Sequence, residues 1–464
     1  MHSLVLLLGL VAAAAALPAM PDPSDLALML NEEDFEDYLD EWLEKEEPKW
    51  VNLTLADEGR DARSGCTFRV KGDLGQPQPV YVHRGRLLMP QGNSGNIRLN
   101  GGEQIRIGCP GTGRTIRHPN INSNTAFATA TCVSGNTVSG AGWLRANGPF
   151  GGLTCSEHPF HEAQATGGRC FGNHAVIRVG FIVDNVFHTW YQSCFDRNRL
   201  EVLYVWYDQN AQHGVHQTGV DRPSWMAGSF FPGVNINTLY TQNHQKARIG
   251  NIVGQDMVGR YITSHQFLAR GHLTAKSDYP FASAQRATFY FINAAPQWQP
   301  FNAGNWNNLE QVNMTFWRFI TNPITIIKAK NLRARIASGT FNTVIYTGTF
   351  GVTQLRDGSN RLRDIFLHDN GRQVPVPQYF YKVAYDAGRR LGTAFISINN
   401  PYYTAAEARS LQFCTDRCRN NNAFNWLRWQ PDRIDLGYSF CCTIADFRRT
   451  ITHIPNWNVV GLLS

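Results

Sequence analysis

The ten cysteines of this 464-residue chain constrain its fold more than any other feature. An even number of cysteines fits an oxidising compartment, where they pair as disulfides. From Cys66 to about Cys155 the chain is rich in Gly, Asn, Thr and Val, with short alternating runs such as PVYVHRG and EQIRIGCPG. This combination predicts an antiparallel β module that is pinned by disulfides.

Four more cysteines, Cys414, Cys418, Cys441 and Cys442, lie close together near the C-terminal end. They can form a four-thiolate zinc site or two disulfides, and a secreted chain favours disulfides. A bridge between the adjacent Cys441 and Cys442 would be strained, so each is expected to pair elsewhere, with Cys414 and Cys418 as candidates. The full connectivity stays open.

The N-terminal residues 1–16, MHSLVLLLGLVAAAAA, have the length and apolar character of a signal peptide, with a small-residue cleavage site at Ala14-x-Ala16. No later apolar run approaches the roughly 18 residues of a membrane span. The sequence therefore predicts a secreted, extracellular protein that does not associate with a membrane.

Residues 17–63 differ in character from the rest of the chain. Twelve acidic residues lie between Pro21 and Glu47. Apolar residues at helical spacing line one face of this segment: Phe35, Tyr38, Leu39, Trp42 and Leu43. One interpretation is a solvated acidic tail, because charge runs are often only that.

The other interpretation is an inhibitory propeptide. Residues 1–63 hold 15 acidic and 4 basic residues, which leaves 21 acidic and 39 basic residues, a formal charge of +18, for residues 64–464. A cationic body with a detachable polyanionic leader suggests that the leader occupies a polyanion-binding surface until it is removed. Arg60 and Arg63 are candidate processing sites.

Further strands are predicted at HAVIRVGFIVDN and EVLYVWYD, and TFNTVIYTGTFGV and VPVPQYFYKVAYD are expected to form a second sheet. Residues 208–246 are rich in turn-forming residues and have only weak periodicity, so no helix or strand is predicted there. We therefore expect an α+β protein with a disulfide-rich β module at 64–200 and a second domain at 201–464.

The stretch from Leu268 to Glu310 carries the candidate chemistry. It contains an Arg-Gly-His turn, an alternating strand-like segment and the helix-like NWNNLE. Phosphodiester hydrolysis needs a base and stabilisation of negative charge, and a neutral imidazole is a suitable base near neutral pH. His272 is the candidate base, Gly271 permits a tight backbone conformation, and Arg270 offers a bidentate fork to phosphate oxygens.

A hard cation such as Mg²⁺ prefers oxygen ligands, and a single protein oxygen suffices to hold it. Asn302 or Asn305 can supply that oxygen. Glu310 lies eight residues past Asn302, about two helical turns along on nearly the same face, so it can act through a water.

These residues resemble the DNA/RNA non-specific endonuclease family of ββα-metal (His-Me finger) nucleases. The chain has ARGH at Ala269–His272, NAAPQ at Asn293–Gln297, then Asn302 and Glu310, in the family's order and at its spacing. VPVPQYFYKV resembles a later core strand, so the resemblance covers about residues 246–400. The N-terminal features look most like the arthropod branch, which includes secreted digestive nucleases and insect double-stranded ribonucleases.

The resemblance implies a ββα-metal core with antiparallel sheets and helices, behind the disulfide-rich module. It implies His272 as general base, Arg270 as transition-state stabiliser and Asn293 as a residue that orients substrate or imidazole. Asn302 would be the direct ligand of Mg²⁺, with Mn²⁺ as an alternative ion, and Glu310 a water-mediated ligand. The family's Asp stands here as Ala269, and this departure bears on metal affinity or metal choice more than on activity.

Three function classes follow. The favoured one is a secreted, Mg²⁺-dependent endonuclease of DNA and/or RNA, including double-stranded RNA, with little sequence specificity and possible action in a digestive lumen. The second is a catalytically inactive cationic nucleic-acid-binding protein, which only Ala269 favours. The third is a zinc-dependent hydrolase, suggested weakly by His158-x-x-His161 and His213-x-x-His216, which do not match H-E-x-x-H.

Other residues have two interpretations as well. A basic run can be a solvated helix face or can contact phosphates that flank a cleft. It comprises Lys328, Lys330, Arg333 and Arg335. Tryptophans 298, 306 and 317 can stack on bases, but their spacing favours the core. The sequons at Asn52 and Asn313 are compatible with secretion.

Overall fold

The computed structural model describes residues 65–464 except 123, 142, 146 and 311–330. Several predicted features therefore lie outside the described residues: the apolar leader, the acidic segment with Arg60 and Arg63, both sequons, Lys328, Lys330 and Trp317. Within the described part of the chain, every helix is too short or too polar to span a bilayer.

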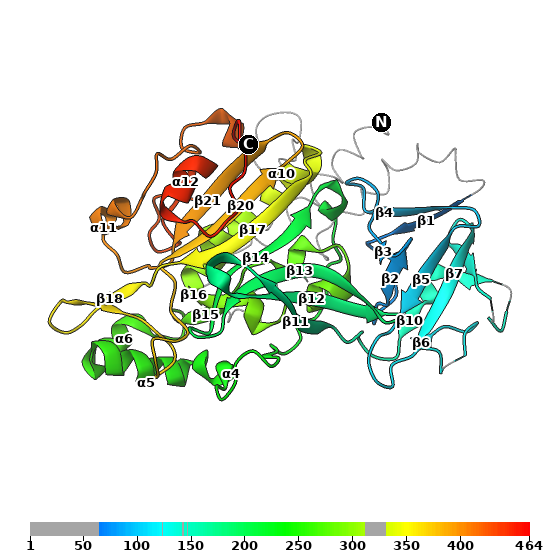
Figure 1. Cartoon of the computed structure of the whole chain (residues 1–464), viewed down its shortest axis with the longest axis horizontal. Helices are drawn as coiled ribbons and strands as arrows, with labels where there is room; N and C mark the ends of the chain where they lie inside the picture. Colours follow the sequence, from blue (N-terminus) through cyan, green and yellow to red (C-terminus); the bar gives the residue numbers. More distant parts are fainter. Residues whose placement is uncertain (1–64, 123, 142, 146, 311–330) are drawn as a thin grey trace, which may run out of the picture.

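The body of the molecule is built on one eight-stranded antiparallel sheet with the order β11-β12-β13-β14-β17-β20-β21-β22 (Figure 1). Its strands are β11 Glu162–Arg169, β12 Ala175–Val183, β13 Val186–Asp196, β14 Glu201–Gln209, β17 Thr343–Phe350, β20 Tyr379–Asp386, β21 Leu391–Ile398 and β22 Ser439–Cys442. The predicted strands are thus confirmed, but the expected second sheet is wrong. β14 pairs directly with β17, with Tyr204 opposite Gly348. After the catalytic stretch, the chain therefore adds its next strand to the same sheet.

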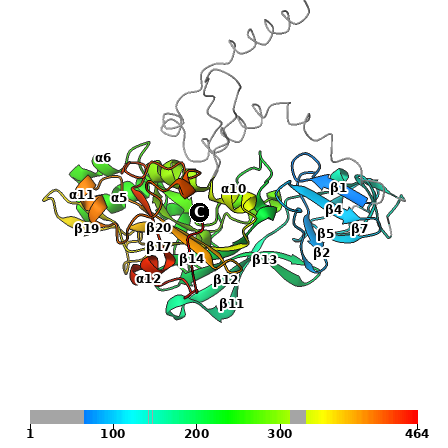
Figure 2. The same ribbon diagram turned by 90° about the horizontal axis from the view of Figure 1, so that it is seen from above.

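The two faces of this sheet belong to different cores because side chains alternate along a strand. On β20, Tyr381 packs against Phe447 of α12 (Ile444–Thr450), with ring centroids 5.0 Å apart. The preceding residue, Phe380, packs on the other face against Trp306, at 5.5 Å. Figure 2 shows α12 on one side of the sheet and α10 (Leu332–Ser338) on the other. The predicted catalytic stretch therefore lies on the face opposite α12.

The N-terminal module is a separate β structure, drawn in blue and cyan in Figure 1. Its six-stranded sheet comprises β3 Arg86–Leu87, β2 Val80–His83, β5 Gln104–Gly108, β7 Phe127–Ser134, β8 Thr137–Ser139 and β9 Gly148–Pro149. Two strand pairs flank it: β1 Gly65–Arg69 with β4 Asn96–Asn100, and β6 Ile116–Arg117 with β10 Thr154–Cys155. The disulfides Cys66–Cys132 and Cys109–Cys155 pin the module, as predicted.

The expected domain boundary at residue 200 lies between two paired strands, since β13 pairs with β14 across it. β11 begins at Glu162 and already belongs to the eight-stranded sheet. We propose instead that the module ends between Cys155 and Glu162.

The remaining helices and turns are short. The α-helices are α4 Ile236–Leu239, α5 Gln242–Val253, α6 Val258–Tyr261, α7 Ala282–Arg286 and α11 Ala405–Ser410, besides those already described and those at the site. The 3₁₀ turns are η2 Phe150–Gly152, η3 Phe171–Asn173, η4 Ala211–His213, η5 Gln255–Met257, η6 Lys276–Asp278, η7 Phe291–Asn293 and η9 Asn422–Phe424; a last strand pair is β18 Gln354–Arg356 with β19 Leu362–Asp364. Thr241 caps α5 by accepting from the His244 N–H, and Gly254 ends the helix at φ 106°.

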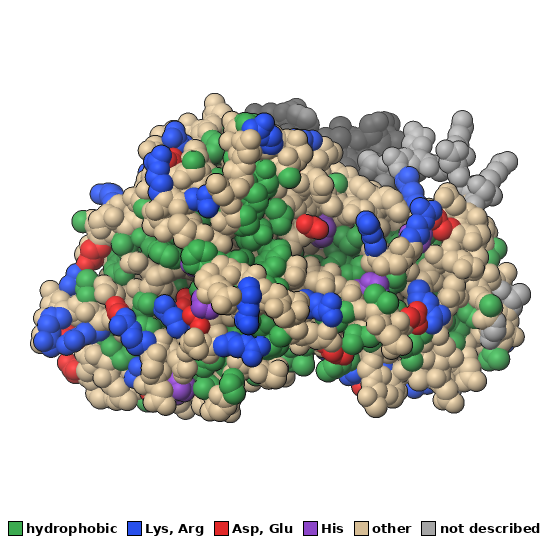
Figure 3. Space-filling model, in the orientation of Figure 1, with side chains coloured by type: hydrophobic (Ala, Val, Ile, Leu, Met, Phe, Trp, Pro, Cys, Tyr) green, Lys and Arg blue, Asp and Glu red, His purple; other side chains and the backbone are tan. Residues whose placement is uncertain are grey.

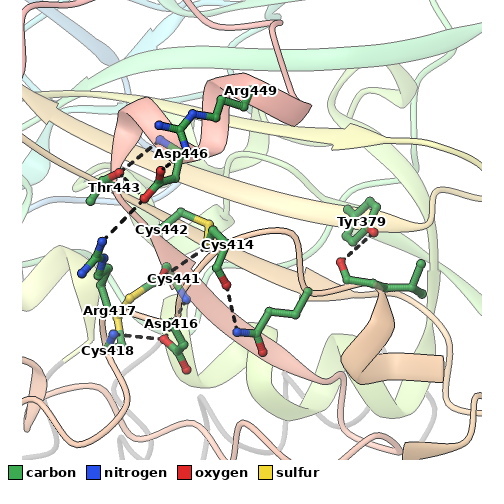
Figure 4. Close-up of a disulfide and its surroundings, with 12 residues drawn as sticks. Tyr379, Cys414, Asp416, Arg417, Cys418, Cys441, Cys442, Thr443, Asp446 and Arg449 are labelled. Atoms are coloured by element: carbon green, nitrogen blue, oxygen red, sulfur yellow. Dashed lines mark hydrogen bonds and ion pairs between the residues drawn. A yellow bond between two sulfur atoms is a disulfide. The ribbon is translucent and has the colours of Figure 1, made fainter. Parts of the chain in front are cut away.

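The C-terminal cysteines form Cys414–Cys442 and Cys418–Cys441 (Figure 4). Adjacent residues of a strand point to opposite faces, so Cys441 and Cys442 reach different partners. Asp416 fixes the loop by accepting from the N–H groups of Cys418, at 3.0 Å, and Cys441, at 3.1 Å. Together with Cys66–Cys132, Cys109–Cys155 and Cys170–Cys194, these two disulfides pair all ten cysteines, which excludes the four-thiolate zinc site.

Candidate active site

The candidate site begins with a strand pair, β15 Leu268–His272 and β16 Ala294–Trp298. Gln245 of α5 holds the start of β15: its Oε1 accepts from the Leu268 N–H and its Nε2 donates to the Leu268 carbonyl, both at 2.8 Å. The Arg-Gly-His turn expected from the sequence is therefore wrong, because these residues continue the strand. Arg270 and His272 lie two residues apart on it, so their side chains share one face.

Glycine is required at position 271 because β15 and β16 pack closely there, not because the chain turns. A Cβ atom built there would lie 2.1 Å from Oε1 and 2.6 Å from Cβ of Gln297, which lies on the neighbouring strand. Gln297 is buried. Only glycine lets the two strands pack at this separation with that side chain between them.

His272 lies in an aromatic setting. Its ring centroid is 4.6 Å from that of Trp225 and 4.9 Å from that of Phe289, in an edge contact. The side chain is buried, and its Nε2 has no hydrogen-bond partner among the described residues. Burial, then the charges of Arg222 and Lys276, hold the pKa of His272 well below its usual range. The imidazole is therefore neutral near pH 7, with a ring nitrogen that is free to accept a proton.

Arg270 lies over two aromatic rings. The guanidinium carbon is 5.6 Å from the ring centroid of Tyr240 and 5.9 Å from that of Phe291. Its Nε is buried and has no hydrogen-bond partner in the described structure. The rings hold the cation by cation–π contact and leave N–H groups for an anion.

Asn293 lies in η7, just before β16, and its side chain makes hydrogen bonds to backbone groups. Its Oδ1 accepts from the Thr274 N–H at 2.9 Å, and its Nδ2 donates to the carbonyls of Thr274 at 3.0 Å and Thr288 at 2.9 Å. These bonds fix the chain two residues after His272. The geometry fits a residue that positions the imidazole through the backbone, not one that contacts substrate.

The helical part of the site is interrupted. It runs through α8 Gln299–Phe301, a π-helical turn η8 Asn302–Trp306 and α9 Asn307–Glu310, with non-helical dihedrals at Gly304 (φ −95°, ψ −120°). A regular helix from Asn302 to Glu310, which the eight-residue spacing assumed, is therefore absent from this stretch. The strand–strand–helix order itself is present.

The two asparagine candidates for the metal ligand differ in their contacts. Asn305 is fully buried; its Nδ2 donates to the carbonyls of Gln430 and Gly437, at 2.9 and 2.7 Å, and its Oδ1 accepts from the Gln430 N–H at 2.7 Å. Its amide oxygen is thus occupied by a neighbouring loop. Asn302 is half-buried at the start of the π-helical turn.

Glu310 belongs to a buried charge network. Its Oε1 accepts from Nζ of Lys382 on β20 at 2.7 Å, and the same Nζ lies 3.7 Å from Oδ2 of Asp278. Tyr207 and Gln209 of β14 donate to the two oxygens of Asp278, at 2.6 and 2.9 Å. Burial raises the pKa of Glu310 to about 7, against the opposing effect of Lys382.

Ala269 is buried and pairs with Gln297 across the strand pair. Because it is one residue from Arg270 and three from His272, it lies on the opposite face of β15 from both side chains. A carboxylate at this position would therefore point away from the face that carries Arg270 and His272.

The histidine pairs do not form metal sites. Nδ1 of His161 lies 3.3 Å from the Tyr290 hydroxyl, and Nδ1 of His213 receives the Asn210 N–H at 3.2 Å. Across the described ranges, the one group of metal-ligating types is Asp416 with Cys418 and Cys441, whose sulfurs are in a disulfide.

Sequence reasoning did not identify several residues of the site. Trp225 contacts His272, the Arg222 guanidinium lies 5.1 Å from the centroid of Phe289, and Lys382 holds Glu310. Arg222 and Trp225 lie in the turn-rich stretch without periodicity. Lys382 is 72 residues from Glu310, so no local pattern could connect them.

Basic side chains outnumber acidic ones on one face of the molecule. Figure 3 shows Lys and Arg side chains on both the module and the body, with fewer acidic ones on the same face. This distribution agrees with the formal charge of +18 for residues 64–464. It suits a protein that collects polyanions.

Comparison with known proteins gives the following relatives. A salivary endonuclease of Lutzomyia longipalpis is 26% identical over 377 residues, 80% of this chain and 79% of that protein. Salivary protein Tsal2A of Glossina morsitans morsitans is 22% identical and covers 86% of this chain and 94% of that protein. The solved complex of EndoG with its inhibitor EndoGI aligns over 60% of this chain and 89% of that one, at 17% identity and a TM-score of 0.33.

The family described as DNA/RNA non-specific endonuclease matches residues 173–447, which is more than half of the chain. The match includes the strand pair, the interrupted helix and Lys382. It ends within α12, so it takes in the whole eight-stranded sheet except its edge strand β11. The chain therefore belongs to the DNA/RNA non-specific endonuclease family, whose members are metal-dependent nucleases.

Proposed function

We propose that this protein is a secreted endonuclease that hydrolyses phosphodiester bonds of double-stranded RNA and/or DNA with little sequence specificity, using Mg²⁺ or, as an alternative ion, Mn²⁺. The observation that carries this proposal is the His272 imidazole. It is kept neutral by burial and by two cations, its Nε2 lacks a partner among the described residues, and it shares a strand face with Arg270. Such a group accepts a proton from an attacking water.

The contacts of each residue at the site indicate its role in the reaction. Arg270 binds the phosphate oxygens with the N–H groups that its aromatic neighbours leave, and Arg222 adds a second positive charge near His272. Both cations stabilise the charge that builds up on the phosphoryl oxygens. Asn293 positions the His272 segment through its bonds to Thr274 and Thr288.

The donor set fits a hard cation. Asn302, at the start of the π-helical turn, would supply an amide oxygen to the cation, and the oxygen of Asn305 accepts from the Gln430 N–H. Lys382 engages Oε1 of Glu310, and Glu310 would hold a water on the metal. When bound, Mg²⁺ supplies Lewis-acid stabilisation of the phosphate and the leaving oxygen.

The experiment is digestion of plasmid DNA and of long double-stranded RNA with and without EDTA. Cleavage that EDTA removes and Mg²⁺ restores supports the proposal, and the ratio of the two rates gives the substrate preference. His272→Ala should lower cleavage by about 10²–10⁴-fold and leave salt-sensitive binding intact. Cleavage that survives this substitution would contradict the assignment of the base.

The second candidate is a nonhydrolytic nucleic-acid-binding protein, which the alanine at position 269 favours. The position of Ala269 on the far face of β15 from His272 weakens that argument. EDTA-insensitive binding without cleavage of either nucleic acid would establish this candidate.

We also propose that residues 17–63 are a propeptide that follows a signal peptide and occupies the cationic surface until cleavage at Arg60 or Arg63. The support is the charge contrast between this segment and the +18 body. The chain 64–464 should then cleave nucleic acid faster than the unprocessed chain, and equal rates would rule out inhibition.

A further inference from the structure

Trp225 is a half-buried tryptophan beside the candidate base. Between ring centroids, its indole lies 4.6 Å from His272, 5.2 Å from Phe289 and 5.6 Å from Phe291. The two phenylalanines are buried. These three contacts cover part of the indole, and the rest of its surface is accessible.

The backbone also fixes Trp225 to the site. The N–H of the next residue, Met226, donates to the Phe289 carbonyl at 2.9 Å, and the Met226 carbonyl accepts from the Phe291 N–H at 3.0 Å. These two bonds form a parallel bridge between Met226 and Tyr290, in the segment that leads into β16. The indole is therefore held beside His272 both by its ring contacts and by its own stretch of chain.

Each of the two phenylalanine rings that contact Trp225 also contacts a cation. The Arg222 guanidinium carbon lies 5.1 Å from the ring centroid of Phe289, and that of Arg270 lies 5.9 Å from the ring centroid of Phe291. Under the proposed function, these two cations stabilise the charge on the phosphoryl oxygens. A phosphate in that position brings the nucleotides on either side of it to the neighbourhood of the indole.

The sugar is the part of a nucleotide that best fits a contact with Trp225. A general base acts at hydrogen-bond distance or through one water, so the reacting phosphate lies close to the imidazole that Trp225 contacts. The phosphate is bonded directly to its two sugars, whereas each base lies one ring farther away. In a duplex the bases also stack on one another, and taking a base out of the stack costs free energy.

We propose that Trp225 is a substrate-binding residue whose indole packs against the pentose ring next to the scissile phosphate, in RNA and in DNA. The inference rests on the proposed function, because a bound nucleic acid supplies this sugar. A contact with the sugar carries no base sequence, which agrees with cleavage of little sequence specificity. A sugar held on Trp225 also fixes the position of the phosphate relative to His272.

The test compares Trp225→Leu, which keeps an apolar side chain but removes the flat ring system, with Trp225→Phe, which keeps one ring. The matched control is Trp457→Leu. Trp457 is also half-buried and lies 4.6 Å from the ring centroid of Tyr385, but it packs in the core on the α12 side of the sheet. Urea unfolding of the full-length variants checks that each one is folded.

The substrates are three end-labelled DNA duplexes of one sequence, cleaved in the presence of Mg²⁺. They differ only in the residues on both sides of one chosen linkage. The first duplex has ordinary nucleotides there, the second has tetrahydrofuran abasic residues, which keep a sugar ring without a base, and the third has propanediol spacers, which keep the phosphodiester without ring or base. Fragment length identifies cleavage at that linkage. Comparing each variant with the unaltered protein on the same duplex cancels what the modification does to the duplex itself.

Trp225→Leu should lower kcat/KM at the chosen linkage by about tenfold on the ordinary and abasic duplexes, the loss expected when about 55 Å² of apolar surface is no longer buried. It should change kcat/KM little on the spacer duplex, because no ring is there to contact. Trp225→Phe should lose less than Trp225→Leu, and Trp457→Leu should leave kcat/KM unchanged on all three duplexes.

Three results would overturn the proposal. An equal loss on all three duplexes would mean that Trp225 only packs against His272. A loss on the ordinary duplex alone would mean that the indole stacks on a base. Unchanged kcat/KM on every duplex would mean that Trp225 does not contact the substrate.

These results are separate from the outcome for the proposed function. If the unaltered protein cleaves the ordinary duplex, the nuclease assignment stands whatever the Trp225 variants do. If it cleaves only RNA, the same modified residues are placed in an RNA duplex and the comparison is unchanged. If it cleaves neither nucleic acid, the proposed function and the sugar contact are both wrong.

Discussion

The Glu310 carboxylate lies 2.7 Å from the ammonium group of Lys382, and this buried pair joins α9 to the central sheet. Lys382 is 3% exposed and also lies 3.7 Å from Asp278. One cation therefore balances two buried carboxylates from different elements. Burial raises the pKa of Glu310, whereas the two carboxylates raise the pKa of Lys382 against the effect of its own burial.

Replacing Lys382 with Met should destabilise the protein strongly, by about 3–5 kcal/mol in the free energy of unfolding, because it leaves Glu310 and Asp278 without their cation. Glu310→Gln should cost less, since Asp278 remains near Lys382. The double variant should recover part of the loss, which a double-mutant cycle in urea measures. Strictly additive effects would show that the two residues do not interact.

The pH dependence of cleavage should reflect the buried imidazole. An ordinary histidine would give a rise in activity centred on about pH 6.5, but burial, Arg222 and Lys276 hold the pKa of His272 well below that value. The base form therefore persists to lower pH, and the rising limb of kcat/KM at constant Mg²⁺ should be centred below pH 6.5.

Arg222→Gln tests the direction of the pKa shift of His272. Removing a nearby positive charge makes the imidazolium easier to form, which raises the pKa of His272 and moves the limb to higher pH. Arg117→Gln, far along the module, should leave the limb in place. A limb at or above pH 6.5 in the unaltered protein would contradict the proposed state of His272.

The sequence predicted the local parts of this site and missed the parts that depend on sheet order. Arg270, His272 and Asn302 lie in one short stretch, and their order and spacing match those of the family that the sequence resembles. The strands β12 and β14 followed from their alternating apolar residues. The separate second sheet was wrong because the pairing of β14 with β17 joins segments between which the whole catalytic stretch intervenes.

Lys382 is a single residue whose role also depends on the order of strands in the sheet. In the sequence it stands in VPVPQYFYKV as a polar position of a strand, and only the packing of β20 beside α9 makes it the partner of Glu310. The eight-residue spacing from Asn302 to Glu310 suggested a regular helix, and the π-helical turn with its break at Gly304 replaces it. There the backbone of the loop at Leu436 packs against Gly304 and bonds to Asn305.

Gly271→Ala tests the close approach of the two strands at the site. The added methyl would meet Cβ of Gln297 at 2.6 Å, an atom that cannot move without its strand. Overpacking of this kind costs about 1–3 kcal/mol. A displacement of His272 by about 1 Å lowers kcat by about 10²-fold.

The control is Gly259→Ala in α6, where the new methyl meets no atom within 4 Å. Alanine suits a helix better than glycine, so this variant should gain about 0.5–1 kcal/mol and keep its kcat. Thermal unfolding and cleavage assays on both variants check the contrast. Full activity in Gly271→Ala would mean that the strand pair tolerates a wider separation than the structure indicates.

Asn302→Ala and Asn305→Ala should separate metal binding from packing within one short segment. Asn305 makes three hydrogen bonds to the loop at Gln430 and Gly437, and its loss leaves buried backbone groups without partners. We expect Asn305→Ala to lower stability by about 1–3 kcal/mol. Asn302→Ala should raise the Mg²⁺ concentration for half-maximal cleavage. A titration of cleavage against Mg²⁺, beside urea unfolding of both variants, distinguishes the two roles. An Asn302→Ala variant with unaltered Mg²⁺ dependence would remove Asn302 as the ligand, and the metal would then have to bind through other oxygens of the site.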